Sequence, residues 1–508
     1  MKNFWRSSLV FLLALTFILA GSIGLQAEED TVVIGSGAEA PGLDTRVEVD
    51  TPAFERINLI NEPLIDIDFD LSLKPKLATD WEYNDDNTEL TFYLREGVYF
   101  HHGREMTAED VKYTIDWILD PDNDASNRDL YTAIGEVEII DDYTVTLHLD
   151  EVNTFLINNI ARFGIVPHDV AEDLGDDFGD EPVGTGPYTF DEWDRDDKLV
   201  LQSFDDYWDG EPNFETVEFR PIPENSARLL AFEAGEIDMF HGGVVPEELE
   251  RLESEPDFDL RRVAGTGYNY LGFNNTNEYM QDRNLRLAIS HMINREAIVE
   301  HVLQGVGRPG QTNITPDMQW YHDELDFVDY DPEKAHEYFE ESIAAEEDVE
   351  LRIFTNEEPF RMQIAEVLEY ELGQLGINVE VVIEEWGAFL DRVYDTDDYE
   401  MYILGWSGLM DPDRASYRQY LSDGSANTIN YSNDRMDELL LEGRQVDPES
   451  EESIEIYHEV QEILNHDQPK AFINYEEEVS LIQPEFENYQ VHPYPGNAWL
   501  SLPNMTRN

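Results

Sequence analysis

The chain has 508 residues, enough for about three domains, and its 41% apolar and 12% aromatic content excludes an intrinsically disordered protein. Its 112 acidic residues against 32 basic ones give a net charge of −80, which disfavours binding to nucleic-acid phosphates or to anionic lipid surfaces. The absence of cysteine excludes disulfides, thiolate metal sites and cysteine nucleophiles.

The same composition indicates a saline environment. Only seven of the basic residues are lysine, and the rest are arginine. A folded chain that is rich in acids, poor in lysine and free of cysteine is typical of a host living in concentrated salt. In such a medium the Debye length falls to about 3 Å, so the self-repulsion of the surface is screened.

The amino terminus has the pattern of an export signal. Lys2 and Arg6 give it a positive start, residues 9–20 are an apolar segment, and residues 25–27 (Leu-Gln-Ala) offer a small-residue cleavage site. We expect cleavage near Ala27, because the apolar segment is shorter than the roughly 20 residues of a membrane-spanning helix. Residues 1–27 contain two basic and no acidic residues, so the mature chain would carry a net charge of −82.

Residues 19–22 resemble a lipoprotein signal in which Ser22 stands in place of the acylated cysteine. The thioether bond to lipid cannot form at a serine. We therefore expect a freely diffusing periplasmic protein without a lipid anchor.

Residues 31–34 are expected to form a strand, and residues 35–40 (Gly-Ser-Gly-Ala-Glu-Ala) imitate the G-x-G-x-x-A fingerprint of dinucleotide sites. That fingerprint must open a helix whose amino terminus holds pyrophosphate. Pro41 and Gly42 interrupt such a helix at once, so we expect no nucleotide cofactor.

Residues 92–113 (FYLREGVYFHHGREMTAEDVKY) predict a strand, a turn at Gly103 and a helix that begins at Thr107. Thr107 and Asp110 form an S/T-x-x-D variant of the capping box.

Metal sites are not expected. The neighbours His101 and His102 would point to opposite faces of a strand, so both cannot reach one ion. Residues 120–131 begin like a calcium loop, but Ala125 replaces the glycine at position six and Tyr131 replaces the bidentate glutamate at position twelve.

Further elements follow from the spacing of apolar residues. Strands are predicted at 144–149, 198–202 and 216–220, with a helix around 224–234. A β-α-β unit is predicted from a strand at 351–354, a helix at 361–375 that ends at Gly376, and a strand at 377–384.

Several short motifs follow one another in a fixed order. They are residues 75–81 (PKLATDW), 92–113, 184–190 (GTGPYTF), 206–212 (DYWDGEP), 234–238 (AGEID), 286–298 (RLAISHMINREAI) and 405–413 (GWSGLMDPD). Together they resemble the pattern of the peptide/nickel-type extracellular solute-binding proteins (family 5), the ligand receptors of ABC importers. The chain departs from that pattern at His102, where the family usually has Asp.

The resemblance implies an α/β fold of two lobes, a type II-like periplasmic-binding-protein fold with an extra subdomain inserted in the first lobe. The chain would cross the hinge near Gly267 and Glu476, and closure of the lobes would bury the ligand without a chemical step. The expected parts are a signal peptide at 1–27, a discontinuous first lobe at 28–50, 182–267 and 477–508, the inserted subdomain at 51–181, and the second lobe at 268–476.

The resemblance also places ligand recognition at residues 405–413. In peptide-binding relatives an Asp shortly after the Gly-Trp pair holds the α-ammonium group of the ligand, and other relatives carry Arg at about the position of Leu409. Here Leu409 and Met410 occupy these places. Asp411 could substitute from two positions further on, or Arg414 could bind a carboxylate through a bidentate pair. Asp411 stands before a proline and is equally typical of a turn cap, so both interpretations stay open.

Aromatic side chains complete the predicted pocket. Trp406 offers a flat face for an apolar side chain, a sugar or a peptide plane. Trp386 lies just past a predicted strand end, where α/β proteins place ligands. Tyr268 and Asn269 lie near the predicted hinge, although tyrosines at such positions are more often part of the core.

The family has a ligand-facing loop at residues 41–44, which adds Leu43 and Asp44 to the predicted site. The expected solute is a short peptide or peptide-like compound, with an oligosaccharide second and a chelated metal third. The expected partners are this solute and the membrane subunits of an ABC permease, and the protein is expected to be a monomer.

An enzyme is the alternative of another class. Carboxylates are so abundant that pairs arise by chance, and the separation that a glycosidase needs cannot be read from a sequence. No G-x-S-x-G elbow or P-loop is present. We therefore expect no catalytic residue, no cofactor and no bound metal, and treat a secreted hydrolase with a carboxylate pair as the weaker hypothesis.

Overall fold

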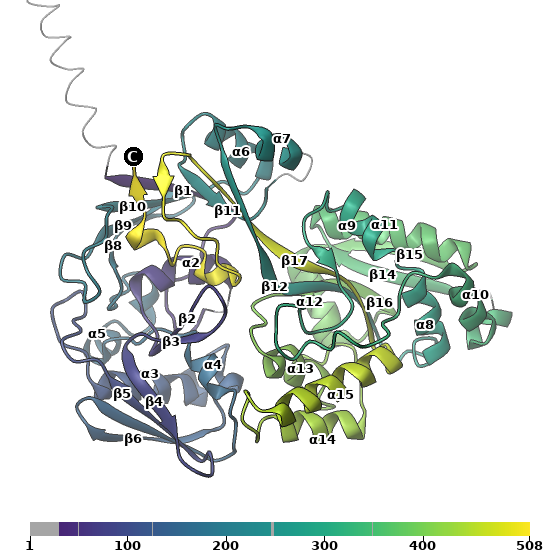
Figure 1. Cartoon of the computed structure of the whole chain (residues 1–508), viewed down its shortest axis with the longest axis horizontal. Coiled ribbons are helices and arrows are strands. Elements are labelled where there is room, and N and C mark those ends of the chain that lie inside the picture. The colour runs from purple at the N-terminus through teal and green to yellow at the C-terminus, as the bar shows by residue number, and fades with distance from the viewer. Residues whose placement is uncertain (1–29, 49, 124, 245–247, 348) are drawn as a thin grey trace, which may run out of the picture.

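The structure is a computed structural model, and it describes residues 30–508 except 49, 124, 245–247 and 348 (Figure 1). The predicted signal peptide, its cleavage site near Ala27 and Ser22 lie outside the described residues. No helix in the described part of the chain is long and apolar enough to cross a membrane.

Within the described residues, one sheet of 11 strands runs through both halves of the molecule (Figure 1), in the order β15-β14-β16-β12-β17-β11-β1-β10-β9-β8, with β13 beside β17. The strands at the first-lobe end are β1 (Thr31–Ser36), β8 (Tyr188–Asp194), β9 (Lys198–Ser203), β10 (Thr216–Pro221) and β11 (Met239–His241). Those at the second-lobe end are β13 (Arg308–Pro309), β14 (Glu350–Asn356), β15 (Asn378–Glu384) and β16 (Met401–Trp406).

Two long strands, β12 (Asp259–Phe273) and β17 (Lys470–Ile482), belong to both lobes and pair antiparallel across the hinge. Their register breaks between Ala264 and Tyr268. Before the break β17 also pairs with β11, and after it β12 pairs with β16. A Cβ at Gly267 would lie 2.7 Å from the carbonyl oxygen of Trp406, so the strands can cross this closely only at a glycine.

The inserted subdomain has its own sheet, in the order β4-β5-β7-β6. Its strands are β4 (Ala78–Tyr83), β5 (Glu89–Leu94), β6 (Ile134–Asp141) and β7 (Thr144–Leu149). Helix α3 (Ala108–Leu119) packs against β6 and β7, and the predicted capping box of Thr107 and Asp110 is present at its start. A two-stranded sheet of β2 (Ile65–Ile67) and β3 (Leu73–Pro75) precedes it in the chain.

Helix α2 (Thr51–Ile60) falls within the range 51–181 that was predicted for the subdomain, but it packs elsewhere. Its Ala53 and Ile57 are fully buried in the first-lobe core, beside Val32 and Trp499. Apolar spacing shows that a helix has a buried face, but it does not show which core receives that face. The other predicted domain limits stay predictions.

The predicted β-α-β unit is confirmed in the second lobe. Strand β14 pairs parallel with β15, and α11 (Pro359–Gln374) connects them and is followed by Gly376 at φ 86°. The remaining helices are α4 (Leu156–Ile160), α5 (His168–Leu174), α6 (Asn225–Glu233), α7 (Leu249–Ser254), α8 (Arg283–His291), α9 (Arg295–His301), α10 (Pro332–Glu340), α12 (Trp386–Asp391), α13 (Pro412–Tyr420), α14 (Asp434–Gly443) and α15 (Glu451–Asp467). The short strands β18 (Phe486–Glu487) and β19 (Thr506–Arg507) pair near the carboxyl terminus.

His101 and His102 lie in a turn and not on a strand. The His101 ring connects this turn to residues 184–186. Its Nδ1 accepts from Gly184 N at 3.2 Å, and its Nε2 lies 3.0 Å from Gly186 O. Burial lowers the pKa of His101 to about 4, so the ring is neutral. Within the described residues, no group of three or more His, Cys, Asp or Glu is placed to hold a metal ion.

Candidate ligand-binding cleft

The two lobes contact each other through α4 and the residues before it. Thr154 Oγ1 donates to the carbonyl oxygen of Val446 at 2.7 Å. Asn158 Nδ2 donates to Asp411 Oδ2 at 3.1 Å. These bonds join the first lobe to the second, so the structure has a closed cleft.

An aromatic side chain strengthens this closure. Phe155 follows the inserted sheet in sequence, yet it is 1% exposed and packs in the core of the second lobe. Its ring makes edge-to-face contacts with Trp320 and Tyr457, at centroid distances of 6.0 and 5.8 Å. The first lobe thus inserts an apolar anchor into the second.

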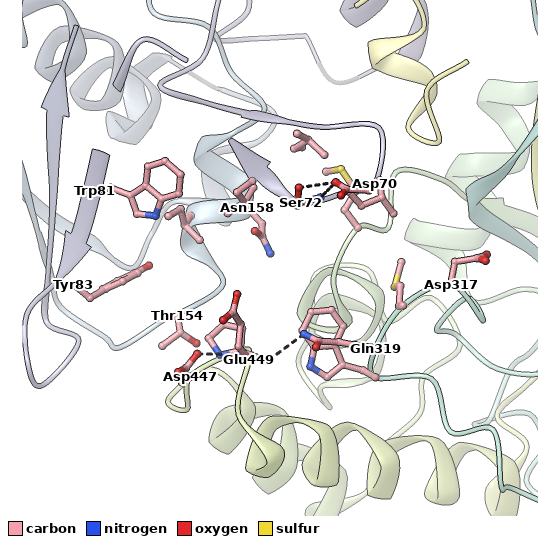
Figure 2. Close-up of a pocket in the computed structure, with 18 residues that line it drawn as sticks. Asp70, Ser72, Trp81, Tyr83, Thr154, Asn158, Asp317, Gln319, Asp447 and Glu449 are labelled. Atoms are coloured by element: carbon pink, nitrogen blue, oxygen red, sulfur yellow. Dashed lines mark hydrogen bonds between the residues drawn. The ribbon is translucent and has the colours of Figure 1, made fainter. Parts of the chain in front are cut away.

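A cavity of about 600 Å³ lies between the inserted subdomain and the second lobe (Figure 2). We call it the wide cavity. Trp81 and Tyr83 stand on the subdomain side, and Gln319 stands opposite them (Figure 2). The carboxylates of Asp70, Asp317, Asp447 and Glu449 also line it. Aromatic faces with a few polar groups suit a small organic solute.

A second cavity, of about 320 Å³, also lies between the lobes. We call it the arginine cavity, because Arg162, Arg414 and Arg418 line it together with Trp406 and Tyr494. Arg162 follows α4 of the first lobe, whereas Arg414 and Arg418 lie on α13 of the second. Both cavities take lining residues from the region of α4 and from residues 405–410.

A sequence profile described as "Bacterial extracellular solute-binding proteins, family 5 Middle" matches residues 72–428 of the chain. The chain belongs to this family. The match confirms the resemblance inferred from the motifs.

Relatives and a solved structure agree with this membership. The oligopeptide-binding protein AppA of Bacillus subtilis is 26% identical over 498 residues, which cover 93% of this chain and 91% of the relative. The dipeptide-binding protein of Escherichia coli K12 is 25% identical over 457 residues, which cover 82% and 84%. The structure of the ABC transporter-associated periplasmic binding protein DppA from Helicobacter pylori, in complex with peptide STSA, has a TM-score of 0.83 at 26% identity and covers 94% of this chain and 98% of that one. The two-lobed α/β fold is therefore confirmed.

The predicted site residues Trp406 and Arg414 meet in the arginine cavity of this family 5 protein. Trp406 is partly buried, and Arg414 Nε donates to the carbonyl oxygen of Gly408 at 3.0 Å. Leu409 is buried in the second-lobe core, whereas Met410 lines the wide cavity. The chain thus has apolar side chains where the family resemblance led us to expect an acid.

Asp411 is the N-cap of α13. Its Oδ1 accepts from Arg414 N at 2.8 Å, and its Oδ2 accepts the bond from Asn158 across the cleft. Burial and, after it, the nearby Asp413 raise the pKa of Asp411 to about 6. The carboxylate thus makes the turn-capping contact, and its predicted ligand role stays a prediction.

The other predicted second-lobe residues lie away from the two cavities. Tyr268 is fully buried, and its hydroxyl donates to Gln419 Oε1 at 2.9 Å. Asn269 lines a third cavity of about 410 Å³ at the hinge, where its Nδ2 donates to Glu476 Oε1 at 3.3 Å. Trp386 begins α12 and is 47% exposed.

The predicted loop residues Leu43 and Asp44 are buried in the first lobe and line neither cavity. Leu43 packs in the first-lobe core. Asp44 forms a bidentate pair with Arg46, with bonds of 2.7 and 2.9 Å, and the Arg46 guanidinium lies 4.2 Å from the ring centroid of Trp117. Their ligand role stays a prediction.

Sequence reasoning missed Phe155, Asn158, Arg162 and Tyr494. They belong to no motif, and their chemistry depends on neighbours that are hundreds of positions away in the chain. Arg162, for example, donates to Tyr494 Oη at 2.8 Å. The one available signal was the scarcity of basic residues, which makes any arginine of this chain a candidate for binding an anionic group.

Proposed function

We propose that this family 5 protein is an extracytoplasmic receptor that binds a peptide or peptide-like solute between its lobes and delivers it, unchanged, to an ABC permease. The observation that carries this proposal is the pair of cavities at the lobe interface. Their volumes, about 600 and 320 Å³, lie in the range of small-molecule sites. The names of the relatives, an oligopeptide-binding and a dipeptide-binding protein, support a peptide.

The hinge geometry supports binding without turnover. The only connection of the two lobes within one sheet is through β12 and β17 as far as the structure describes the chain, so closure can proceed by bending at their register break. We also propose that the leader is cleaved near Ala27 and that the mature protein acts as a periplasmic monomer.

An oligosaccharide is the second candidate, because the predicted ammonium-binding position is apolar and aromatic side chains line the wide cavity. Leu409 and Met410 replace the acid that holds the peptide ammonium group in relatives, while Trp81 and Tyr83 line the wide cavity. Aromatic faces suit sugar rings, and the carboxylates that also line this cavity can accept hydrogen bonds from sugar hydroxyl groups.

Native mass spectrometry tests the proposal. The purified protein is incubated with a randomised tripeptide pool or with malto-oligosaccharides, and the retained molecules are released and weighed. We expect tripeptides to be retained and released at unchanged mass. Retention of sugars alone would favour the second candidate. Cleavage that a single carboxylate substitution abolishes would show an enzyme instead.

A further inference from the structure

The arginine cavity concentrates positive charge in a chain that has little of it. Acidic residues outnumber basic ones by 112 to 32, yet Arg162, Arg414 and Arg418 line one cavity of about 320 Å³. Charges of one sign repel at short range, and an arrangement of this kind is stabilised by a counter-ion.

Within the described part of the chain, only one of the three arginines has a protein counter-ion. Arg418 Nη2 lies 2.9 Å from Asp129 Oδ2. Arg162 and Arg414 both donate to the neutral carbonyl oxygen of Gly408, at 3.3 and 3.0 Å. Among the residues that the structure describes, no carboxylate lies within ion-pair distance of either guanidinium.

One hydrogen-bond donor in the cavity is also unpaired. Arg414 Nη1 is buried and has no hydrogen-bond partner within the described part of the chain. Buried donors are nearly always satisfied in native proteins, so this one indicates a missing acceptor. Asn127 Oδ1 is unpaired in the same cavity, and turning this amide over would present an NH₂ donor instead.

The electrostatics of the two free arginines agree with this interpretation. Burial and the nearby Arg162 charge lower the pKa of Arg414 to about 9, so Arg414 is still charged at neutral pH. An anion between them would reverse the repulsion and supply the missing acceptor.

We propose that the arginine cavity binds a carboxylate group of the transported solute, with Arg162 and Arg414 as its donors. This inference rests on the proposed receptor function and adds the chemical class of one end of the solute. A guanidinium and a carboxylate match in a planar, bidentate geometry. In a peptide the group is either the terminal carboxylate or the side chain of an acidic residue.

The position of the donors adds a mechanical role. Arg162 belongs to the first lobe, whereas Arg414 belongs to the second. A carboxylate held by both sides therefore bridges the cleft and favours the closed state. A neutral analogue would lose this bridge and bind mainly to one lobe.

The test compares peptide pools by native mass spectrometry at constant ionic strength. One randomised tripeptide pool has free carboxyl termini, and the other has the same composition with terminal amides. We expect at least tenfold greater retention from the free-acid pool, and loss of this preference in Arg162→Gln and Arg414→Gln. Arg435→Gln is the matched control, because Arg435 is an exposed arginine on α14 that pairs with Glu459 at 2.8 Å. Melting curves show that each variant is folded, and Arg414→Lys should keep part of the preference.

A second experiment, chemical labelling of arginines, uses the wild-type protein without peptides. Phenylglyoxal modifies accessible arginines, and we expect glutarate, but not glutaramide, to protect Arg162 and Arg414 while Arg435 labels equally in both. Equal retention of both pools by the wild-type protein overturns the carboxylate site and leaves the receptor function standing. Retention of amidated peptides that all contain Asp or Glu supports the site and identifies a side-chain carboxylate.

The peptide-receptor proposal can also fail while the carboxylate-site proposal survives. If no peptide is retained from either pool but glutarate protects the two arginines, the peptide receptor fails and the carboxylate site survives. If neither peptides nor glutarate bind, both proposals fail.

Discussion

Replacing Phe155 by alanine should weaken the closure of the lobes and leave each lobe folded. The side chain is 1% exposed and contacts Trp320 and Tyr457 in the opposite lobe. Truncation of a buried phenylalanine costs about 3 to 5 kcal/mol. In an open form Phe155 is already separated from these neighbours, so most of this loss falls on the closed state.

A loss of about 3 kcal/mol changes the ratio of closed to open molecules on the order of a hundredfold. Small-angle X-ray scattering without ligand should therefore give a larger radius of gyration for Phe155→Ala than for the wild-type protein. Retention of tripeptides should fall as well, because ligand binding must then drive closure against this deficit.

Phe232→Ala is the matched control. Phe232 is fully buried and makes an edge-to-face contact with Phe240 at 5.7 Å, but both residues belong to the first lobe. This variant should melt at a lower temperature with an unchanged radius of gyration. If Phe155→Ala behaves in the same way, Phe155 is an ordinary core residue and the reasoning is refuted.

Three further predictions concern the cleft and the charge. Trp406→Ala should weaken solute binding by about 1 to 3 kcal/mol with little effect on melting, whereas a core role would lower stability by about 3 to 5 kcal/mol; calorimetry and melting curves distinguish these results. Because the pKa of Asp411 is raised to about 6 in the folded state, ionisation of this carboxylate lowers stability as the pH rises from about 4 to 6. Asp411→Asn should therefore gain up to about 3 kcal/mol relative to the wild-type protein between pH 4 and 7, and parallel melting curves would contradict this. Finally, dilution from molar salt to tens of millimolar should loosen or unfold the protein, which circular dichroism across a salt series would detect as a falling melting temperature.

Local patterns in the sequence predicted much of the fold. The alternation in residues 144–149 matches β7, and Gly376 ends the helix of the β-α-β unit as expected. Such features depend on neighbours within a few residues, so a sequence contains them. The order of motifs added the family, and with it the two lobes.

The site was harder to predict, because its residues act through distant partners. The hydroxyl of Tyr268 is bonded to Gln419 on α13, and nothing in the local sequence shows this partner. Asp44 pairs with Arg46 inside the first lobe, which the sequence also does not show. The ligand roles of both residues stay predictions. Arg162 was not considered at all, since nothing in its local sequence shows that the chain will place it opposite Arg414.

The arginine cavity has a kinetic consequence for a protein of this charge. In dilute buffer, at about 0.01 M salt, the Debye length is about 30 Å, so a chain with net charge −80 repels an anionic solute well before contact. The guanidinium groups attract that solute only after it has entered the cleft. Added salt removes the long-range repulsion first and should speed up the encounter, which is the reverse of the usual effect of salt on steered association. The salinity of the surroundings would then regulate how fast this receptor captures acids, although the shape of its cavity stays the same.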